Sequence, residues 1–160
     1  MTENDHKASP QAEALTALIL SLFRVNNLTI NWGDRLVAPL GLTSARWQIL
    51  GAIAYADRPR PVAWLARDLG ANRQNIQRIV NDLHKDGIVS FTPNPHHKRA
   101  HLVVLTVKGR RVYDEALRLY VPRANALAED ISSDDLEAAR RVMDVLKIKL
   151  EGNGDAEEQV

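Results

Sequence analysis

A chain of 160 residues is long enough to bury the core of one domain, or of a small unit that forms dimers. Its residues are 45% hydrophobic and 26% charged, as in ordinary soluble globular proteins, and no apolar run approaches the ~20 residues of a membrane-spanning helix. The lack of cysteine excludes disulfides, cysteine-based zinc sites and thiol-based oxidant sensing. The polar N-terminus lacks the apolar segment of a signal peptide, so we expect a cytoplasmic protein with no membrane partner.

The charge of the chain is unevenly distributed. The net charge is only +1, yet residues 58–111 contain 11 Lys and Arg against 3 Asp, a charge of +8, and the remainder carries −7. A segment of concentrated positive charge is the pattern expected of a surface that contacts phosphates. The middle of the chain is therefore the place to look for a nucleic-acid interface.

The N-terminal region is predicted to form one long helix. After residues 1–8, which we expect to be disordered, Ser9 suits an N-cap and Pro10 a first helical residue. The helix should continue to about Val37, and its apolar residues cover more than one face, which predicts burial against a partner chain as well as against its own domain. We assign residues 9–40 to a dimerisation region. Its apolar positions include Leu15, Leu18, Ile19, Leu22, Phe23, Val25, Leu28 and Trp32.

A second helix should begin after a Thr43 cap and end near Ala56, because Pro39 and Gly41 separate it from the first helix. The loop that follows contains Pro59 and Pro61 and cannot be helical throughout. The inner face of this second helix is predicted to hold Trp47, Leu50, Ile53 and Ala54.

Two shorter helical patterns separated by a tight turn come next. The first contains Leu65, Ala66 and Leu69 and stops at Gly70, and Asn72 then suits the N-cap of the second. The second helix carries an apolar stripe up to its own glycine stop, Gly87. That stripe consists of Ile76, Ile79, Val80 and Leu83.

The opposite face of this second short helix carries amide and guanidinium side chains, where an exposed helix usually carries Glu and Lys pairs. Such groups can reach base edges and phosphates. A helix, a short turn and a helix with these groups toward its N-terminus place a recognition helix in a major groove. The alternative is a polar face that is exposed to solvent and has no binding role. The candidate DNA-binding residues are Arg73, Gln74, Asn75, Gln77, Arg78 and Asn81.

A β-hairpin with a basic tip is predicted after the recognition helix. The β-branched and apolar runs 88–91 and 102–105 flank a loop in which Pro93 and Pro95 prevent continued strand pairing. We also expect Val62 to pair briefly with this hairpin. The loop should therefore project as a wing, and an arginine on it suits the narrow minor groove. Its candidate DNA-binding residues are His97, Lys98 and Arg99.

The last part of the chain is predicted to hold two helices that complete the dimerisation region, residues 107–150. Pro122 lies inside the first and predicts a kink or a local break near Leu119. Ser132 opens the second with a capping box in which Asp135 replaces the usual Glu. An acidic tail, residues 151–160, is expected to be disordered. A two-helix seam is predicted at Leu136, Ala139, Met143, Leu146 and Leu150.

Several of these segments together resemble the multiple-antibiotic-resistance regulator (MarR) family of winged helix-turn-helix transcription factors. The resemblance covers roughly residues 10–150. It implies a mainly α fold with a small β-wing, in which residues 41–106 form the DNA-binding domain between N- and C-terminal dimerisation helices. The segments are Gly41-Leu42-Thr43 with Trp47 and Leu50, Leu65-Ala66, Gln77-Arg78 with Leu83 and Gly87, and Arg99 with Leu105-Thr106 and Gly109.

The wing departs from the broad family pattern at one position. His97 stands where the family has an Asp two residues before Arg99, and this removes the carboxylate that would orient the guanidinium. A subset of similar sequences instead carries Asn-Pro-x-His-x-Arg-Ala, which matches residues 94–100.

The resemblance implies a homodimer on double-stranded DNA, acting as a ligand-responsive repressor at a pseudo-palindromic operator. It also implies a crevice for a small aromatic or phenolic effector. Trp32 and Trp47 could stack on such a ligand, and Arg46 could pair with its carboxylate, although packing is the alternative role for all three.

Three other interpretations compete with a DNA-binding regulator. An enzyme is disfavoured because the sequence has no phosphate-binding glycine loop, nucleophile motif or spaced carboxylate pair, and we expect no cofactor. A winged helix used only for protein interaction or dimerisation has little need for a basic wing. A metal site is the third interpretation, because four histidines fall in one region. We assign none of them as a metal ligand, because adjacent histidines in a proline-bounded loop more often contact DNA or solvent. The four histidines are His84, His96, His97 and His101.

Overall fold

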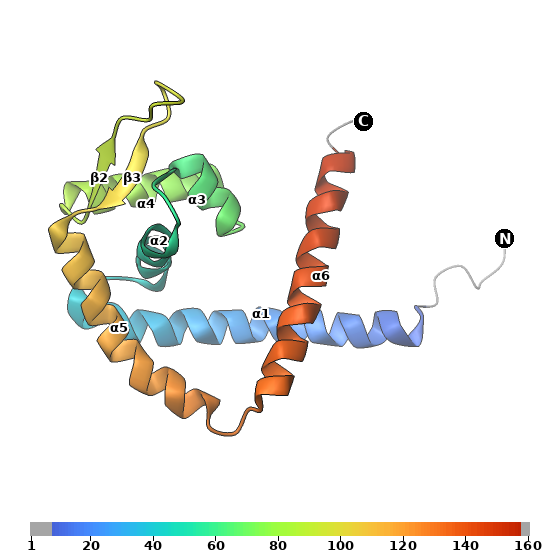
Figure 1. Ribbon diagram of the computed structural model, residues 1–160. Coiled ribbons are helices and arrows are strands. Elements are labelled where there is room, and N and C mark those ends of the chain that lie inside the picture. Colours follow the sequence, from blue (N-terminus) through green and yellow to red (C-terminus); the bar gives the residue numbers. More distant parts are fainter. Residues whose placement is uncertain (1–7, 158–160) are drawn as a thin grey trace. The chain divides into compact units, whose positions relative to one another are not determined.

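The structure, a computed structural model, describes residues 8–157, with side chains described as far as Gly152. The chain divides into two compact units that meet between Leu119 and Tyr120. The first unit contains the elements before this point, and the second contains the end of α5 and all of α6. In chain order (Figure 1) the elements are α1 (Pro10–Val37), η1 (Ala38–Leu40), α2 (Ser44–Tyr55), β1 (Arg60–Pro61), α3 (Val62–Asp68), α4 (Arg73–Lys85), β2 (Val89–Thr92), β3 (Leu102–Leu105), α5 (Val107–Ala128) and α6 (Ser133–Glu157).

The mainly α fold with a small β-sheet is confirmed. The three strands are antiparallel in the order β1-β3-β2, and the hairpin register pairs Val89 with Leu105 and Thr92 with Leu102. The predicted partner of the hairpin was wrong by a residue or two, because Arg60 and Pro61 pair with β3 whereas Val62 begins α3. Proline lacks an N–H donor, so Pro61 fits this edge strand and then serves as the N-cap of the helix.

One hydrophobic core occupies the first unit and fixes the recognition helix. The stripe predicted on α4 is buried, with Val80 and Leu83 fully inaccessible to solvent. From α2, the buried residues Ile49 and Leu50 contribute to the same core, which α3 joins through Leu65. α2 contacts α1, α3 and α4, so it is the element on which the helix-turn-helix is assembled.

The predicted helix ends are confirmed at the first three helices of this core. Ser9 caps α1, its Oγ accepting the Ala12 N–H at 3.1 Å, and Thr43 caps α2. Gly70 separates α3 from α4 with a φ of +58°, a left-handed conformation that costs glycine little because it has no Cβ. The turn of the helix-turn-helix therefore depends on this glycine.

The end of the second unit differs from the prediction. α6 continues to Glu157, so the disordered tail predicted for residues 151–160 is wrong as far as the described residues extend. An ion pair one helical turn apart, between Lys147 and Glu151 at 4.0 Å, spans the predicted boundary and supports the continued helix. The disorder predicted for residues 1–8 falls on segments outside the described residues except at Ala8.

Two further expectations concern helix interruption and capping. We predicted a kink or a local break near Leu119, and the break is not formed, because α5 runs unbroken through Pro122. One proline removes one backbone hydrogen bond, and the neighbouring turns are sufficient to keep the segment helical. The Ser132 cap of α6 is confirmed, with its Oγ accepting the Asp135 N–H at 3.1 Å and donating to the Asp135 carboxylate at 2.6 Å. Within the described residues, no helix combines the length and apolarity needed to span a membrane.

The start of α5 is docked closely on the turn between α4 and β2. The Thr106 N–H donates to the Ile88 carbonyl at 3.1 Å, and the Thr106 hydroxyl donates to the Gly87 carbonyl at 2.7 Å. A Cβ at Gly109 would overlap the Ile88 carbonyl oxygen and would lie 3.0 Å from its carbon. Glycine is required there by close approach of two backbone segments.

We therefore predict that Gly109→Ala destabilises the protein by about 1–3 kcal/mol, because a backbone segment must shift to admit the methyl group. Urea unfolding measures the change. Gly51→Ala is the matched control, since its Cβ would meet only a Tyr113 ring carbon at an ordinary 3.9 Å. That control should be neutral or stabilising by up to about 1 kcal/mol, because Ala is the better helix former. Equal destabilisation by the two substitutions would contradict the close-approach argument.

Candidate nucleic-acid interface

The recognition helix α4 begins at a strong cap. The Asn72 Oδ1 accepts the N–H groups of Gln74 at 2.9 Å and Asn75 at 3.3 Å, which satisfies two of the donors left free at a helix start. The burial of Ile76 and Val80 then fixes the rotation of the helix about its axis. Cap and stripe together determine which side chains face away from the core.

The predicted polar face is turned outward, as the rotation requires. Gln77 is half-buried, and the other five candidates are exposed. Two pairs are linked along the helix, Gln77 Nε2 donating to Asn81 Oδ1 at 3.0 Å and Arg78 Nη2 donating to Asn75 Oδ1 at 3.1 Å. These hydrogen bonds hold long side chains in a row without burying them, so the row remains accessible to a ligand. The five exposed candidates are Arg73, Gln74, Asn75, Arg78 and Asn81.

The wing tip is an ordered loop organised by one asparagine. The Asn94 Oδ1 accepts the His96 N–H at 3.0 Å, and its Nδ2 donates to the Ala100 carbonyl at 3.0 Å. Backbone bonds from His97 to Asn94 and from Ala100 to His97 complete the loop. Asn94 thus bridges the base of the tip beside Arg99, a role that the sequence motif contained but that we did not assign from it.

A surface pocket of about 220 Å³ joins the wing to the recognition helix. Arg73 and Gln77 reach it from α4, and Arg99 and His101 reach it from the wing, with Phe91 also in its lining. Of these, Phe91 and His101 were not predicted as binding residues. Two guanidinium groups around one opening form a place where an anion such as a phosphate is attracted from two elements at once.

A second feature missed by the sequence analysis lies on α3. Trp64 is 46% exposed, and the guanidiniums of Arg60 and Arg67 lie 4.9 and 5.9 Å from its ring centroid. Both distances are within the range of cation–π attraction. Arg60 also pairs with Asp57 at 2.8 Å. The signal in the sequence was a Trp with one arginine four residues before it and another three residues after it.

The comparisons with known proteins agree with this geometry. The family model described as "MarR family" matches residues 40–100. A protein of Mycobacterium tuberculosis is 34% identical over 129 residues, which are 81% of this chain and 89% of that protein. The multiple antibiotic resistance protein MarR of Escherichia coli K12 is 32% identical over 108 residues, 63% of this chain and 72% of that protein. The chain belongs to the MarR family.

Solved structures of the family share the fold. The transcriptional repressor CouR bound to a 23-mer DNA duplex matches with a TM-score of 0.71 and 25% identity, covering 88% of this chain and 99% of that chain. CouR from Rhodococcus jostii RHA1 bound to p-coumaroyl-CoA matches with a TM-score of 0.73 and 21% identity, covering 81% and 90%. This MarR-family protein is accordingly a transcriptional regulator with a winged helix-turn-helix fold, and the family is not one of enzymes.

The residues predicted to bind an effector lie where α1 meets α2. Trp32 and Trp47 are both half-buried, and a Cβ at Gly33 would overlap the Ser44 hydroxyl and come within 4.0 Å of the Trp47 ring. The Ser44 hydroxyl donates to the Ile30 carbonyl at 2.8 Å, so the two helices are in close contact here. Trp47 in this MarR-family protein therefore packs against the core at the contact of α1 with α2.

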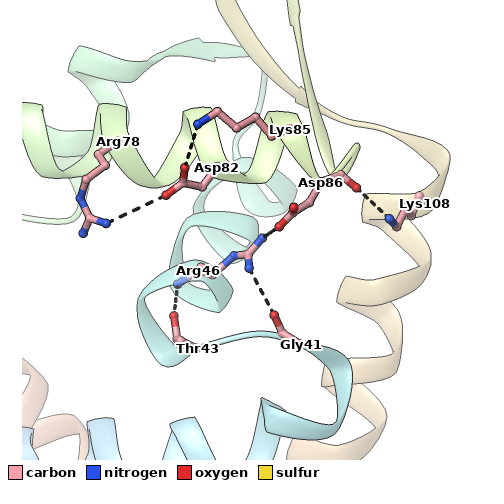
Figure 2. Close-up of polar contacts among 8 residues, drawn as sticks. All are labelled: Gly41, Thr43, Arg46, Arg78, Asp82, Lys85, Asp86 and Lys108. Atoms are coloured by element: carbon pink, nitrogen blue, oxygen red, sulfur yellow. Dashed lines mark hydrogen bonds and ion pairs between the residues drawn. The ribbon is translucent and has the colours of Figure 1, made fainter.

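Arg46 already has partners within the protein. Its guanidinium pairs with the Asp86 carboxylate at the end of α4 and donates to the Gly41 carbonyl at 3.3 Å (Figure 2). The group predicted to bind an effector carboxylate is thus engaged by a carboxylate of the protein itself.

His84, one of the four histidines considered as metal ligands, has contacts of its own within the protein. His84 lies 3.1 Å from the Val89 carbonyl through Nδ1 and packs against Phe91. In the part of the chain that the structure describes, no three His, Asp or Glu side chains are grouped so as to hold a metal ion.

Proposed function

We propose that this MarR-family protein binds double-stranded DNA as a homodimer, represses transcription at a pseudo-palindromic operator, and is released by a small aromatic or phenolic effector. One observation carries the proposal: the outward polar face of α4 and the wing arginine Arg99 border the same pocket. A single DNA duplex can therefore engage both elements. The description of CouR as a transcriptional repressor supports the sign of regulation.

The recognition helix supplies the groups for direct reading of bases. Gln and Asn side chains can bond adenine with two hydrogen bonds, and Arg can do the same with guanine or bind a phosphate. Gln74 is exposed near the helix N-terminus, which is the end that approaches base edges in helix-turn-helix complexes. Arg78 and Gln77 would exchange their bonds to Asn75 and Asn81 for bonds to DNA, so little side-chain entropy is lost on binding.

The wing contributes positive charge, whereas α4 reads the base sequence. Lys98 and Arg99 are exposed on a loop closed by Asn94, so a guanidinium can enter a minor groove without the loop having to fold first. Arg73 opens on the same pocket as Arg99, and a backbone phosphate between them would be held from both sides. Arg67 beside Trp64 extends the positive surface along α3.

The homodimer is supported by apolar side chains exposed on the long helices. In the first unit, Leu20, Phe23 and Leu28 of α1 are 58–65% exposed. In the second unit, Leu136 and Leu150 of the predicted seam are 50% and 69% exposed. Helices with this much accessible apolar surface bury it against a partner, and a second copy of the chain offers the same surfaces by symmetry. Two recognition helices then enter successive major grooves about 34–36 Å apart.

The effector part of the proposal is supported by a relative, since CouR was solved with p-coumaroyl-CoA. Trp32 and Trp47 offer aromatic surface at the contact of α1 with α2, and are the candidates for stacking on an effector ring. Arg46 could join such a site only by leaving Asp86. A releasing ligand must bind the free dimer more tightly than the DNA-bound dimer, because equal affinity shifts no equilibrium.

The test of the function is selection of bound sequences from random DNA, followed by affinity measurements on the selected sequence. We predict that Gln74→Ala and Gln77→Ala each cost about 1–3 kcal/mol of binding and relax the preference at one position of the site. Gln48→Ala makes the same chemical change at an exposed position of α2 and should alter neither. An unchanged preferred sequence in both α4 variants would show that this helix does not read bases. A winged helix that serves only in protein interaction would select no sequence.

A second prediction concerns the wing. Arg99→Ala and Lys98→Ala should weaken binding to selected and scrambled DNA alike, because the phosphates are the same in every sequence. The slope of log K against log salt concentration should become shallower by about 0.9 for each phosphate that the variant no longer neutralises. Arg118→Ala removes the same charge from α5, where Arg118 is paired with Glu115, and should leave the slope unchanged. A normal slope in Arg99→Ala would remove the wing from the interface.

A third prediction tests the α6 seam. Leu136→Asp should dissociate the dimer, because the new side chain would place an unpaired carboxylate in the interface. The chain itself should stay folded, because Leu136 is 50% exposed in the single chain. Val145→Asp makes a similar change at 51% exposure on the opposite side of α6, and should leave the dimer intact. Sedimentation velocity measures both. A dimeric Leu136→Asp protein would show that the predicted seam does not build the interface.

A further inference from the structure

The C-terminal end of the recognition helix is held by groups from two other elements. Asp86 is the C-cap residue of α4. Its carboxylate pairs with Arg46 of α2, and its carbonyl oxygen accepts a bond from the Lys108 Nζ of α5 at 2.7 Å (Figure 2). Contacts from both sides therefore converge on one residue at the end of α4.

A carboxylate is electrostatically misplaced at this position. The unpaired carbonyls at a helix C-terminus carry partial negative charge, which favours Lys, Arg or His there and disfavours Asp. The other acid near this end, Asp82, has Lys85 at 3.5 Å and Arg78 at 4.0 Å on α4 itself. For Asp86, Arg46 is the cation that forms the ion pair among the described residues, and it comes from another helix.

Contacts at the start of α2 hold the Arg46 guanidinium toward α4. It lies in the first turn of α2, where its N–H is bound by the Thr43 hydroxyl at 3.3 Å, and its Nη1 donates to the Gly41 carbonyl at 3.3 Å. Only 21% of its side chain is exposed, and its buried Nε has no hydrogen-bond partner among the described residues. The Asp86 carboxylate thus supplies the acceptor for Nη2 of a half-buried guanidinium, as the Gly41 carbonyl does for Nη1.

We propose that Arg46 and Asp86 form a positioning pair that fixes the C-terminal end of α4 on α2, and with it the angle at which the recognition helix meets DNA. The inference rests on the proposed function, because the angle matters only if α4 reads bases. Arg46 acts through Asp86 and touches neither DNA nor an effector in this role.

The length of α4 explains why loss of the pair should weaken binding to the selected sequence more than binding to DNA in general. The 13 residues of α4 span roughly 20 Å at 1.5 Å per residue, so a tilt at Asp86 displaces the side chains at the opposite end. Hydrogen bonds to base edges tolerate little displacement, whereas long cationic side chains follow phosphates as they move. Loss of the pair should raise the dissociation constant for the selected sequence and leave that for scrambled DNA nearly unchanged.

The misplaced carboxylate makes the two members of the pair unequal. Arg46→Ala leaves the Asp86 carboxylate without its ion-pair partner beside the helix carbonyls, whereas Asp86→Asn removes the unfavourable charge and keeps the carbonyl that binds Lys108. The defect of Arg46→Ala should therefore be suppressed by Asp86→Asn. Suppression of one substitution by a second is a signature that direct DNA contact by Arg46 would not produce.

The experiment compares wild type, Arg46→Ala, Asp86→Asn and the double variant at one salt concentration. The measurements are the dissociation constants for selected and scrambled DNA and the urea midpoint of unfolding. We expect Arg46→Ala to lower the ratio of specific to non-specific affinity about tenfold, Asp86→Asn about threefold or less, and the double variant to match Asp86→Asn. Arg46→Lys, which keeps the charge but not the planar fork, should fall between wild type and Arg46→Ala and serves if the alanine variant does not fold.

Three outcomes would overturn the proposal. If the double variant keeps the full defect of Arg46→Ala, then Arg46 contacts DNA or another group directly. If the urea midpoints are non-additive but the specificity ratio is constant, the pair stabilises the fold and does not position the helix. If no DNA sequence is selected at all, the proposed function fails, and additive urea midpoints would then separately exclude the pair.

Discussion

Burial of the apolar stripe on α4 is the constraint on which the proposed DNA interface depends. Ile76, Ile79, Val80 and Leu83 can be removed from water only at one rotation of the helix, and the removal of such side chains is worth about 1.5–3 kcal/mol each. That rotation turns the amide and guanidinium face outward. The surface that we propose to read DNA is thus a by-product of core formation, because burial of the stripe orients polar groups that lie outside the core.

The same core explains how distant parts of the chain are placed around the helix. α2 contributes Leu50 to the core and Arg46 to the end of α4, so one helix both packs with the recognition helix and pairs with its C-terminal residue. α5 begins against the α4–β2 turn, where the Ile88 carbonyl leaves no room for a side chain at Gly109. A chain that is well packed at this point has few ways to change the angle of α4 without disturbing its core.

Much of the first unit could be predicted from the sequence because periodic burial and caps are local signals. The stripe on α4, the Asn72 cap and the hairpin of residues 88–105 are of this kind. Interactions across the fold left no such signal. The pairing of Arg46 with Asp86 joins residues 40 positions apart, and it is visible only when α2 and α4 are packed together. The extent of α6 was mispredicted because glycines and acids near residue 151 indicate a helix end in general but do not enforce one.

The wing loop is closed by its own atoms, since Asn94 bonds to residues of the loop and to none beyond Ala100 among the hydrogen bonds of the described residues. A loop of this kind is structurally independent of the hairpin that carries it. The side chains at its tip can be exchanged without a change to the hairpin that bears them, in the way that antibody loops vary on a constant framework. Grafting the segment 93–101 between related regulators would therefore transfer the properties of the tip while leaving the recognition helix as it was.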